Sequence, residues 1–383
     1  AKIHAKSTHI IMVLGVLFTA ASCSGLRAVD EVAPLLVENN IQVNGKTTKS
    51  DDDFDIMRQR PNRGIGNIRI FLSLHQIGTS IGENVFGQWL KSIGEAPAVY
   101  DSVARVNSAA QLGLHYFNLG FYKTEVTTYE TVKRKKVIAH YRINTGPEYT
   151  ISKYSITSTS RFIDSALAFH APLLASGDAI VAETLENEQL SVLNFLKNHG
   201  YYQAKLGWVY FEVDTTGGPS QSQIACIVDP YIYGGSIERK TLSKITVEPN
   251  YSYTNTLAVR DSVRTLNGMD ILQHSRRFRP GFLDDQIFLA RGAYYNNSEL
   301  RSTFKNLTAL GVFKNIELDI KDLDSTLTAR IKLVPLPKRA VTAAIEGLGN
   351  NGSLGIGGNF SWDNRNLFKG GELLRLSVGG SVT

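Results

Sequence analysis

Three stretches of this chain share one pattern: apolar residues at helical spacing, then a glycine, then strand-like sequence with an aromatic residue two positions after the glycine. The glycines are Gly120, Gly200 and Gly311. A helix that ends in a sharp turn needs a residue able to adopt the left-handed conformation, and glycine does so without a Cβ clash. We therefore predict a positive φ at each glycine and a fold built from a repeated helix-to-strand module.

The aromatic residues of these junctions are Tyr122, Tyr202 and Phe313, and we expect them to act with the glycines as structural residues of each repeat junction. The intervals between the glycines are unequal, whereas a solenoid would keep a constant period. Each copy is therefore predicted to be a separate α+β domain with the element order β-α-α-β-β. The expected layout is a signal peptide over 1–22, a tether over 23–34, the three copies over 35–148, 149–235 and 236–337, and a final β segment over 338–383.

Several local features are expected within this layout. The first copy carries an insertion at about 62–101, whose glycine and aromatic residues show no clear period. A helix is predicted over 54–60, capped by the preceding aspartates and ended by Pro61. The third copy is expected to have its first helix near 281–290 and to be enlarged by a loop around 251–280.

The N-terminal sequence has the features of a secretory signal peptide. Basic residues precede an apolar run over 10–18 that is too short to span a bilayer, and the small residues 20–22 follow it. Small residues directly before Cys23 resemble a bacterial lipoprotein signal, which implies that Cys23 is lipidated. An ordinary signal peptide cut near Ala21 is the alternative. Cys226, the other cysteine, is then left without a disulfide partner and is predicted to be a buried thiol.

Beyond residue 340 apolar residues alternate strictly with small or polar ones, over 341–345, 354–363 and 374–382. Such alternation is typical of transmembrane β-barrel strands, in which one face meets lipid and the other meets the lumen. A soluble β-sandwich is an alternative source of the same pattern. Three strands cannot close a barrel, and an open edge in lipid leaves backbone groups unpaired. We therefore expect the chain to be a piece of a longer protein.

The sequence nominates no catalytic, cofactor-binding or metal-binding residue. The motif over 347–352 matches the dinucleotide fingerprint, but strand-like sequence follows it where that motif needs a helix, so a turn is the better interpretation. The histidines lack metal-ligand spacing, and no nucleophile elbow or phosphate loop is present. The net charge of +6 is diffuse, and the basic run 133–136 is predicted to be a hairpin turn. We expect neither an enzyme nor a nucleic-acid-binding protein.

The repeats resemble polypeptide-transport-associated (POTRA) domains, and the run over 359–372 resembles the start of the barrel in the BamA/TamA family of outer-membrane assembly factors. The most specific part is the barrel-start motif, made of Asn364, Arg365, Asn366, Leu367 and Phe368. Together with Cys23, a long first unit and three repeats, the chain is most similar to the lipoprotein variant TamL. The resemblance implies three tandem POTRA-like domains followed by the first strands of a transmembrane antiparallel β-barrel.

The same resemblance implies an outer-membrane protein with its POTRA arm in the periplasm, anchored to lipid at Cys23. Its partners would be unfolded outer-membrane proteins and a TamB-like periplasmic protein. Sheet-bearing modules offer an edge to which an extended strand can add by backbone hydrogen bonds. By analogy with the family, the second strand of each repeat, such as 204–213, is the expected edge. A two-partner-type secretion pore and a surface enzyme carried on a POTRA-barrel are alternatives; the enzyme would need a catalytic domain before the repeats.

Overall fold

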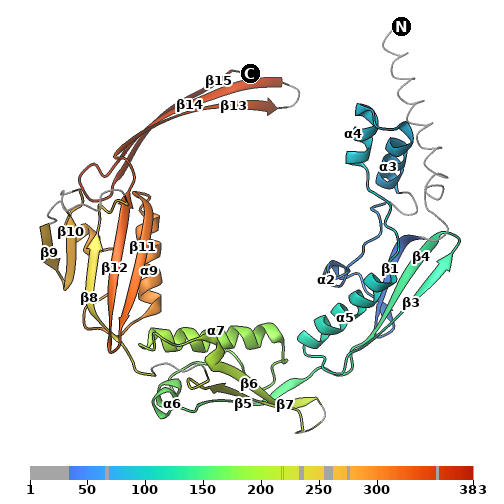
Figure 1. Ribbon diagram of the computed structural model, residues 1–383, viewed down its shortest axis with the longest axis horizontal. Coiled ribbons are helices and arrows are strands. Elements are labelled where there is room, and N and C mark those ends of the chain that lie inside the picture. Colours follow the sequence, from blue (N-terminus) through green and yellow to red (C-terminus); the bar gives the residue numbers. More distant parts are fainter. Residues whose placement is uncertain are drawn as a thin grey trace. The chain divides into compact units, whose positions relative to one another are not determined.

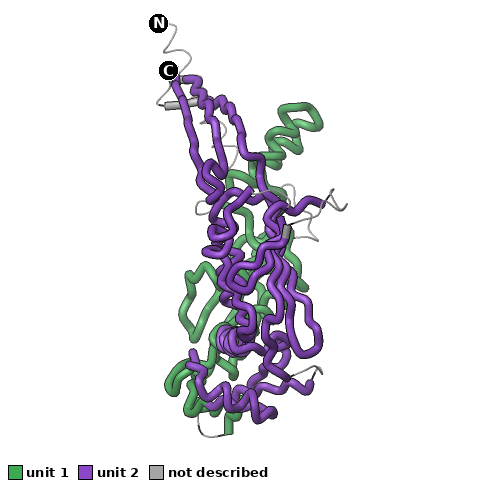
Figure 2. Tube along the Cα trace, turned by 90° about the vertical axis from the view of Figure 1, so that its left-hand side faces the viewer, with its two compact units in different colours: residues 1–154, 174–185, 213–224 green, residues 155–173, 186–212, 225–383 purple. Residues whose placement is uncertain are grey.

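A computed structural model describes residues 34–64, 69–216, 218, 220–232, 237–253, 262–273, 277–350 and 353–382. The predicted signal peptide, Cys23 and nearly all of the tether lie outside the described residues. The chain divides into two compact units, shown in Figure 2. The first unit comprises residues 1–154, 174–185 and 213–224, and the second comprises residues 155–173, 186–212 and 225–383.

The first module is built on a four-stranded sheet (Figure 1). Its strands are β1 (Leu35–Val43), β2 (Lys46–Thr47), β3 (Glu125–Lys133) and β4 (Lys136–Asn144), in the order β2-β1-β4-β3. β1 runs parallel to β4, and β3 pairs antiparallel with β4. The basic run forms the turn between β3 and β4, with Arg134 at a φ of 59°. The predicted hairpin turn is therefore confirmed.

Helix α5 (Ser102–Asn118) packs on this sheet. It begins at Ser102 because the Asp101 side chain accepts a hydrogen bond from the Val103 amide and caps the first turn. Leu112, fully buried, joins the core formed with β1 and β4. The helix predicted over 54–60 is wrong: α2 (Asp51–Asp55) takes the aspartates into its first turn, where carboxylates are favoured by the helix dipole.

The insertion contains an antiparallel pair of helices, α3 (Ile70–Ile81) and α4 (Val85–Ile93). The two helices approach closely through glycines: a Cβ added to Gly78 would lie 2.7 Å from the Gly87 carbonyl oxygen. The Asn84 side chain caps α4 by accepting from the Gly87 amide at 2.7 Å. Close glycine contacts, rather than interlocking apolar side chains, hold the two helices together.

The second module has a three-stranded sheet in the order β5-β7-β6. Its elements are β5 (Thr150–Ser158), α6 (Arg161–Leu167), α7 (Ala182–Asn198), β6 (Val209–Asp214) and β7 (Gln221–Val228). The strand predicted over 204–213 starts later than expected because a short 3-10 turn, η2 (Leu206–Trp208), buries the Trp208 side chain completely. Cys226 in β7 is buried, as predicted.

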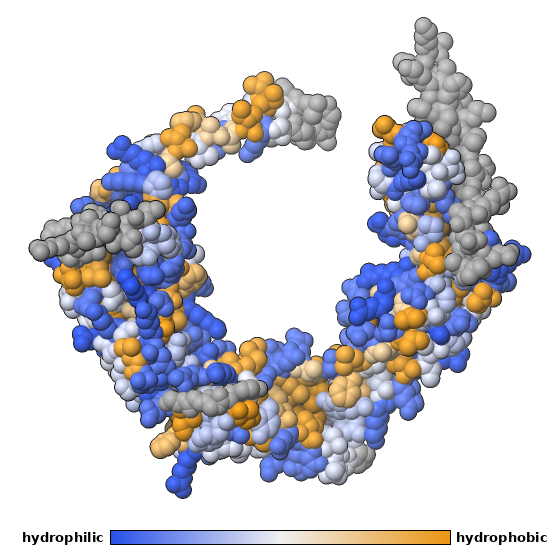
Figure 3. Space-filling model, in the orientation of Figure 1, coloured by the Kyte–Doolittle hydropathy of each residue, from blue (hydrophilic) through white to orange (hydrophobic). Residues whose placement is uncertain are grey.

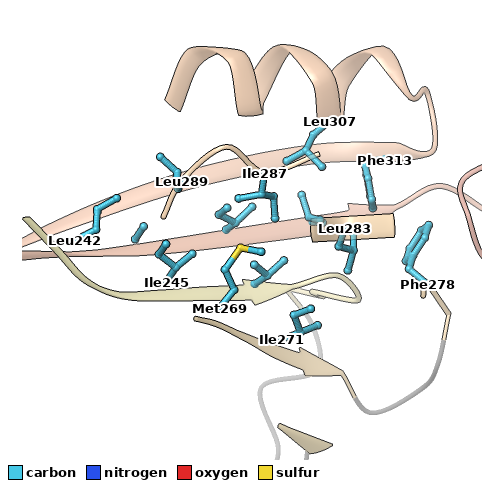
Figure 4. Close-up of a cluster of buried hydrophobic side chains, with 14 of the residues drawn as sticks. Leu242, Ile245, Met269, Ile271, Phe278, Leu283, Ile287, Leu289, Leu307 and Phe313 are labelled. Atoms are coloured by element: carbon cyan, nitrogen blue, oxygen red, sulfur yellow. The ribbon is translucent and has the colours of Figure 1, made fainter. Parts of the chain in front are cut away.

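The third module has a five-stranded sheet in the order β11-β12-β8-β10-β9. Its elements are β8 (Thr241–Glu248), β9 (Ser262–Leu266), β10 (Met269–Gln273), α8 (Pro280–Asp284), α9 (Asn297–Ala309), β11 (Phe313–Leu323) and β12 (Thr326–Pro335). The segment expected to be a loop thus contributes the β9-β10 hairpin. The helix expected near 281–290 ends at Asp284, because Ile287 and Leu289 turn into the core shown in Figure 4.

In all three modules the last strand lies between the first strand and the strand that precedes the last: β1-β4-β3, β5-β7-β6 and β8-β12-β11. The predicted α+β fold, with the element order β-α-α-β-β at the core of each module, is therefore confirmed. A last sheet follows, an antiparallel meander of β13 (Arg339–Asn350), β14 (Ser353–Arg365) and β15 (Leu373–Val382). Within the part of the chain that the structure describes, the helices are too short or too polar to cross a membrane.

Candidate functional site: sheet edges and module junctions

We call β3, β6 and β11 the second strand of their modules, because each is the second strand of the β-α-α-β-β order. Each of them lies at the edge of its sheet. Each of these strands pairs with a neighbour on one side, and among the described residues no strand pairs with its other side. An unpaired edge presents a row of backbone donors and acceptors to which another extended segment can add. The three edges differ in length and surroundings.

Helix α5 lies alongside the β3 edge. Its Arg105 pairs with Glu130 of β3 at 2.9 Å. The helix also exposes an apolar stripe at helical spacing, formed by Val103, Val106, Leu114 and Phe117. This stripe lies on the side of α5 away from the buried Ser108, Ala109 and Leu112, so the first module offers open backbone at β3 and a separate apolar surface on α5.

The other two edges are less open. β6 spans six residues, and the Gln189 side chain of α7 donates to the Val209 carbonyl at 2.5 Å, which satisfies its first acceptor. β11 is longer but carries charges, among them Glu317, which pairs with Lys332 at 3.2 Å. Hydrogen bonds from Tyr253 and Lys332 lower the pKa of the Glu317 carboxyl. Charged residues discourage indiscriminate pairing at an edge.

The three junction glycines have the positive φ that the sequence predicts: 96° at Gly120, 97° at Gly200 and 62° at Gly311. At the first two, the glycine carbonyl accepts from the residue that precedes the next module's first strand: Tyr149 N at 3.0 Å and Lys240 N at 2.9 Å. The same backbone clasp thus joins consecutive modules twice.

Each clasp has a second backbone bond. Ile180 N donates to the Tyr149 carbonyl at 3.0 Å, and Tyr295 N donates to the Lys240 carbonyl at 2.8 Å. A Cβ added to Gly120 would lie 3.0 Å from the Ile180 oxygen, which leaves little space for a side chain. A Cβ added to Gly311 would have no neighbour within 4 Å. The third glycine therefore turns the chain without forming a clasp.

The aromatic residues of the first two junctions contact the next module, whereas that of the third does not. The Tyr122 hydroxyl donates to the Ile180 carbonyl at 3.0 Å, and the Tyr202 ring meets the Tyr295 ring edge-on at 5.0 Å. Burial raises the pKa of Tyr295 to about 12. Phe313 instead packs in the core of its own module, 5.1 Å from the Phe278 ring.

A buried ion pair reinforces the second junction. The Lys240 side chain is 1% exposed, and its ammonium pairs with Asp322, which also accepts from Gln203 at 2.9 Å. Although burial alone would raise it, these hydrogen bonds lower the pKa of the Asp322 carboxyl. The sequence pattern gave no sign of this pair, because Lys240 and Asp322 are 82 residues apart along the chain.

We expect acid to loosen the second junction. A carboxyl whose folded pKa lies below its ordinary value of about 4 stabilises the fold above that value and loses this contribution as pH falls through the folded pKa. The protection factor of the Lys240 amide, which corrects for the slower intrinsic exchange in acid, should therefore decrease as the pH falls from about 5 to 3. Asp322→Asn should already show fast exchange at neutral pH and a flatter pH profile; an unchanged profile in this variant would contradict the assignment.

The barrel-start motif forms a turn that is hydrogen-bonded to the third module. The Asn366 amide nitrogen donates to the Arg277 carbonyl at 2.7 Å, and its oxygen accepts from the Gly371 amide at 3.1 Å. The Glu372 carboxylate accepts from backbone amides of the turn and from Arg279 at 3.3 Å. We call these residues, Arg277, Arg279, Asn366, Gly371 and Glu372, the clamp.

The other motif residues lie outside the clamp. Arg365 pairs with Asp363 at 3.0 Å, and Asp363 also binds Arg375 through two hydrogen bonds. Asn364 is buried, Leu367 is half-buried and the Phe368 side chain is exposed. Sequence analysis did not single out Arg277 or Arg279, since they are remote from the motif along the chain.

The last sheet separates its side chains into two faces, because the strand register aligns apolar residues across all three strands. One row joins Val341, Trp362 and Leu376, and the next joins Ala343, Phe360 and Val378. The opposite face holds rows such as Thr342, Ser361 and Ser377. Most of the apolar side chains are exposed, and orange marks them along these strands in Figure 3. A continuous exposed apolar face of this kind needs an apolar environment.

The described residues contain no group of three or more histidine, cysteine or acidic side chains that could hold a metal ion. No family model matches the chain, and no curated protein matches it.

Solved structures match at low identity. The POTRA3-5 segment of BamA from Haemophilus influenzae is 14% identical with a TM-score of 0.37, covering 80% of this chain and 99% of that one. BamA from Haemophilus ducreyi lacking POTRA domains 1-3 is 16% identical with a TM-score of 0.39, covering 61% of this chain. CdiB from Acinetobacter baumannii is 15% identical with a TM-score of 0.29, also covering 61%. This chain spans 37% of that BamA structure and 38% of CdiB.

Proposed function

We propose that this chain is the periplasmic arm and first barrel strands of an outer-membrane assembly factor of the BamA/TamA family. In this proposal the arm binds extended strands of unfolded outer-membrane proteins by backbone addition. The observation that carries it is the strand order, which leaves the second strand of every module at a sheet edge. Strand addition makes few demands on client side chains, which suits a binder of many clients.

Among the three edges, β3 is the proposed primary binding edge. It spans nine residues, and α5 lies alongside it through the Arg105–Glu130 ion pair. A client strand added to β3 would gain backbone hydrogen bonds along this open edge. β6 is short and β11 is charged, so these edges suit weaker contacts or a partner such as a TamB-like protein.

The C-terminal sheet and the N-terminal cysteine supply the membrane attachment in this proposal. The apolar face of β13, β14 and β15 would lie against lipid, and the clamp would fix the third module to the strand β14 and its turn. Cys23 would carry the lipid anchor: acyl chains contribute about 0.8 kcal/mol per buried CH₂, so more than one chain anchors stably. The arm itself binds and positions clients without catalysis.

Proline substitutions along β3 test the binding edge. Successive residues of a strand point their amides in opposite directions, so one of Thr127 and Thr128 directs its N–H outward and the other directs it toward β4. Thr127→Pro and Thr128→Pro should both weaken crosslinking of the chain to unfolded outer-membrane strand peptides. We expect the outward position to do so without lowering the melting temperature, since an edge proline there removes no internal hydrogen bond.

Alanine at the same two positions is the matched control and should leave crosslinking close to that of the parent chain. Peptides of scrambled sequence with low β propensity should crosslink weakly. Equal crosslinking of parent and both proline variants would refute strand addition at β3.

A further inference from the structure

Helix α4 exposes an apolar face that the hairpin does not bury. Its exposed apolar side chains are Val85 at 87%, Phe86 at 58%, Trp89 at 53% and Ile93 at 41%. On a helical projection these four fall within about 100° of the circumference, with Lys91 on the opposite side and Ser92 and Gln88 bordering the face next to Val85. The Phe86 and Trp89 rings stack at 5.7 Å. Orange marks part of this hairpin in Figure 3.

The hairpin is fixed to the beginning of β1. Leu72 of α3 is buried against Leu35, the first residue of β1, with Val37 packed beside them. Arg69, just before α3, donates to the Val37 carbonyl. Close packing at Gly94, where a Cβ would lie 2.4 Å from His75 N, holds the far end of α4 against α3. The exposed face is therefore a rigid surface at the point where the tether meets the first module.

We propose that the apolar face of α4 docks on the phospholipid surface of the membrane that carries the anchor at Cys23. The proposal rests on the proposed function, because it takes Cys23 to be lipidated. Residues 23–34 span at most about 40 Å when extended, so the hairpin stays near the bilayer. A short helix with tryptophan and other apolar residues on one face and polar residues on the other matches the interfacial mode of membrane binding.

A protein partner fits this surface less well. The face consists of four side chains on one nine-residue helix. A stable protein interface buries about 800 Å² on each partner, which is more than one face of so short a helix supplies. At a membrane already holding the anchor, by contrast, a second weak contact is enough to orient the arm, because the tether keeps the local lipid concentration high.

Tryptophan quenching tests the docking directly. The full chain carrying Trp362→Phe retains Trp89 and the buried Trp208, which serves as an internal reference. The lipid-anchored protein is reconstituted into vesicles of phosphatidylethanolamine and phosphatidylglycerol, with or without bromine on the acyl chains. We expect brominated lipid to reduce the Trp89 emission several-fold and to leave the Trp208 emission unchanged. The variant Trp89→Leu measures the Trp208 emission by itself.

Two double variants distinguish docking through α4 from non-specific hydrophobic binding. Val85→Ser with Ile93→Ser should remove most of the quenching of Trp89. Phe162→Ser with Phe169→Ser, at exposed apolar positions in the second module, should leave it intact. Both pairs alter exposed side chains, and unchanged circular dichroism melting confirms that the chain still folds. Equal loss in both pairs, or no quenching of Trp89 by brominated lipid, would overturn the proposal.

Mass spectrometry of the mature N-terminus in the same preparation distinguishes failure of the lipid anchor from failure of the docking. Acylated Cys23 without quenching of Trp89 would refute the docking and leave the anchor standing. An unmodified Cys23 would refute the anchor and, with it, the docking that depends on it. Protection of Trp89 from aqueous iodide without quenching by brominated lipid would identify a protein occupant and refute the lipid assignment.

Discussion

Gly200→Val is expected to destabilise the second junction by about 2 kcal/mol or more, because a β-branched residue is strained at a φ of 97°. An added Cβ would also lie 3.2 Å from side-chain atoms of both Arg239 and Tyr294, so these neighbours would have to shift by a few tenths of an ångström. The backbone bond from Lys240 N to the Gly200 carbonyl should weaken in consequence. Thermal unfolding measures the stability, and hydrogen exchange at the Lys240 amide measures the clasp.

Gly177→Val is the matched control. Gly177 has nearly the same φ, 98°, but an added Cβ would meet nothing within 4 Å. This variant should carry the cost of backbone strain while leaving exchange at Lys240 unchanged. If both variants speed exchange at Lys240 equally, the glycine at 200 serves the turn alone and the clasp does not depend on close approach.

Asn366→Ala is expected to release the clamp. Asn366 is 5% exposed. Its side chain donates a hydrogen bond to the Arg277 carbonyl and accepts one from the Gly371 amide. Leaving such buried groups unpaired costs about 1–3 kcal/mol each, and alanine also tolerates the φ of 69° less well than asparagine. Limited proteolysis within 366–372 should become faster and the melting temperature should fall.

Phe368→Ala is the control within the same motif. Its side chain is 68% exposed, so the variant should leave both proteolysis and melting near those of the parent chain. Asn366→Gly separates the two causes, since glycine accepts a positive φ but supplies no amide. A clamp that survives Asn366→Gly would show that backbone conformation, rather than the side-chain bonds, holds the turn in place.

The sequence carried enough information to predict the repeated module because its signals are local. Helix α9, which precedes Gly311, is a local feature: Asn296 caps it by accepting from the Ser298 and Glu299 amides, and apolar residues follow at helical spacing. Strand β12 is equally local, because it buries the alternate residues Leu327, Ala329, Ile331 and Leu333. Caps, periodicity and glycine turns can each be recognised within a few residues.

Features that depend on contacts distant in sequence were missed. The α3-α4 hairpin is held by Gly78, Gly87 and Gly94, which bring its backbones together and leave the apolar face of α4 exposed. The β9-β10 hairpin adds to β8 through Met269, Asp270 and Ile271, a pairing that short-range pattern does not show.

The candidate edges and junctions were predicted unevenly for the same reason. The turn at Gly200 is a local property, whereas its closure by Lys240 and Asp322 depends on how the second and third modules meet. Similarly, Asn366 stood out as part of a motif, but its partner Arg277 lies in a different module. Which strand is an edge follows from sheet order, which the sequence supplied only by analogy.

Hydrogen exchange of β3 with a bound client peptide tests the central claim most directly. An unfolded outer-membrane strand peptide that adds to β3 should protect alternate amides along Glu125–Lys133, namely those that point away from β4, and should leave the central strand β4 unchanged. Peptide binding that protects no β3 amide, or that alters exchange only in α5, would contradict backbone addition and indicate recognition by side chains of the helix.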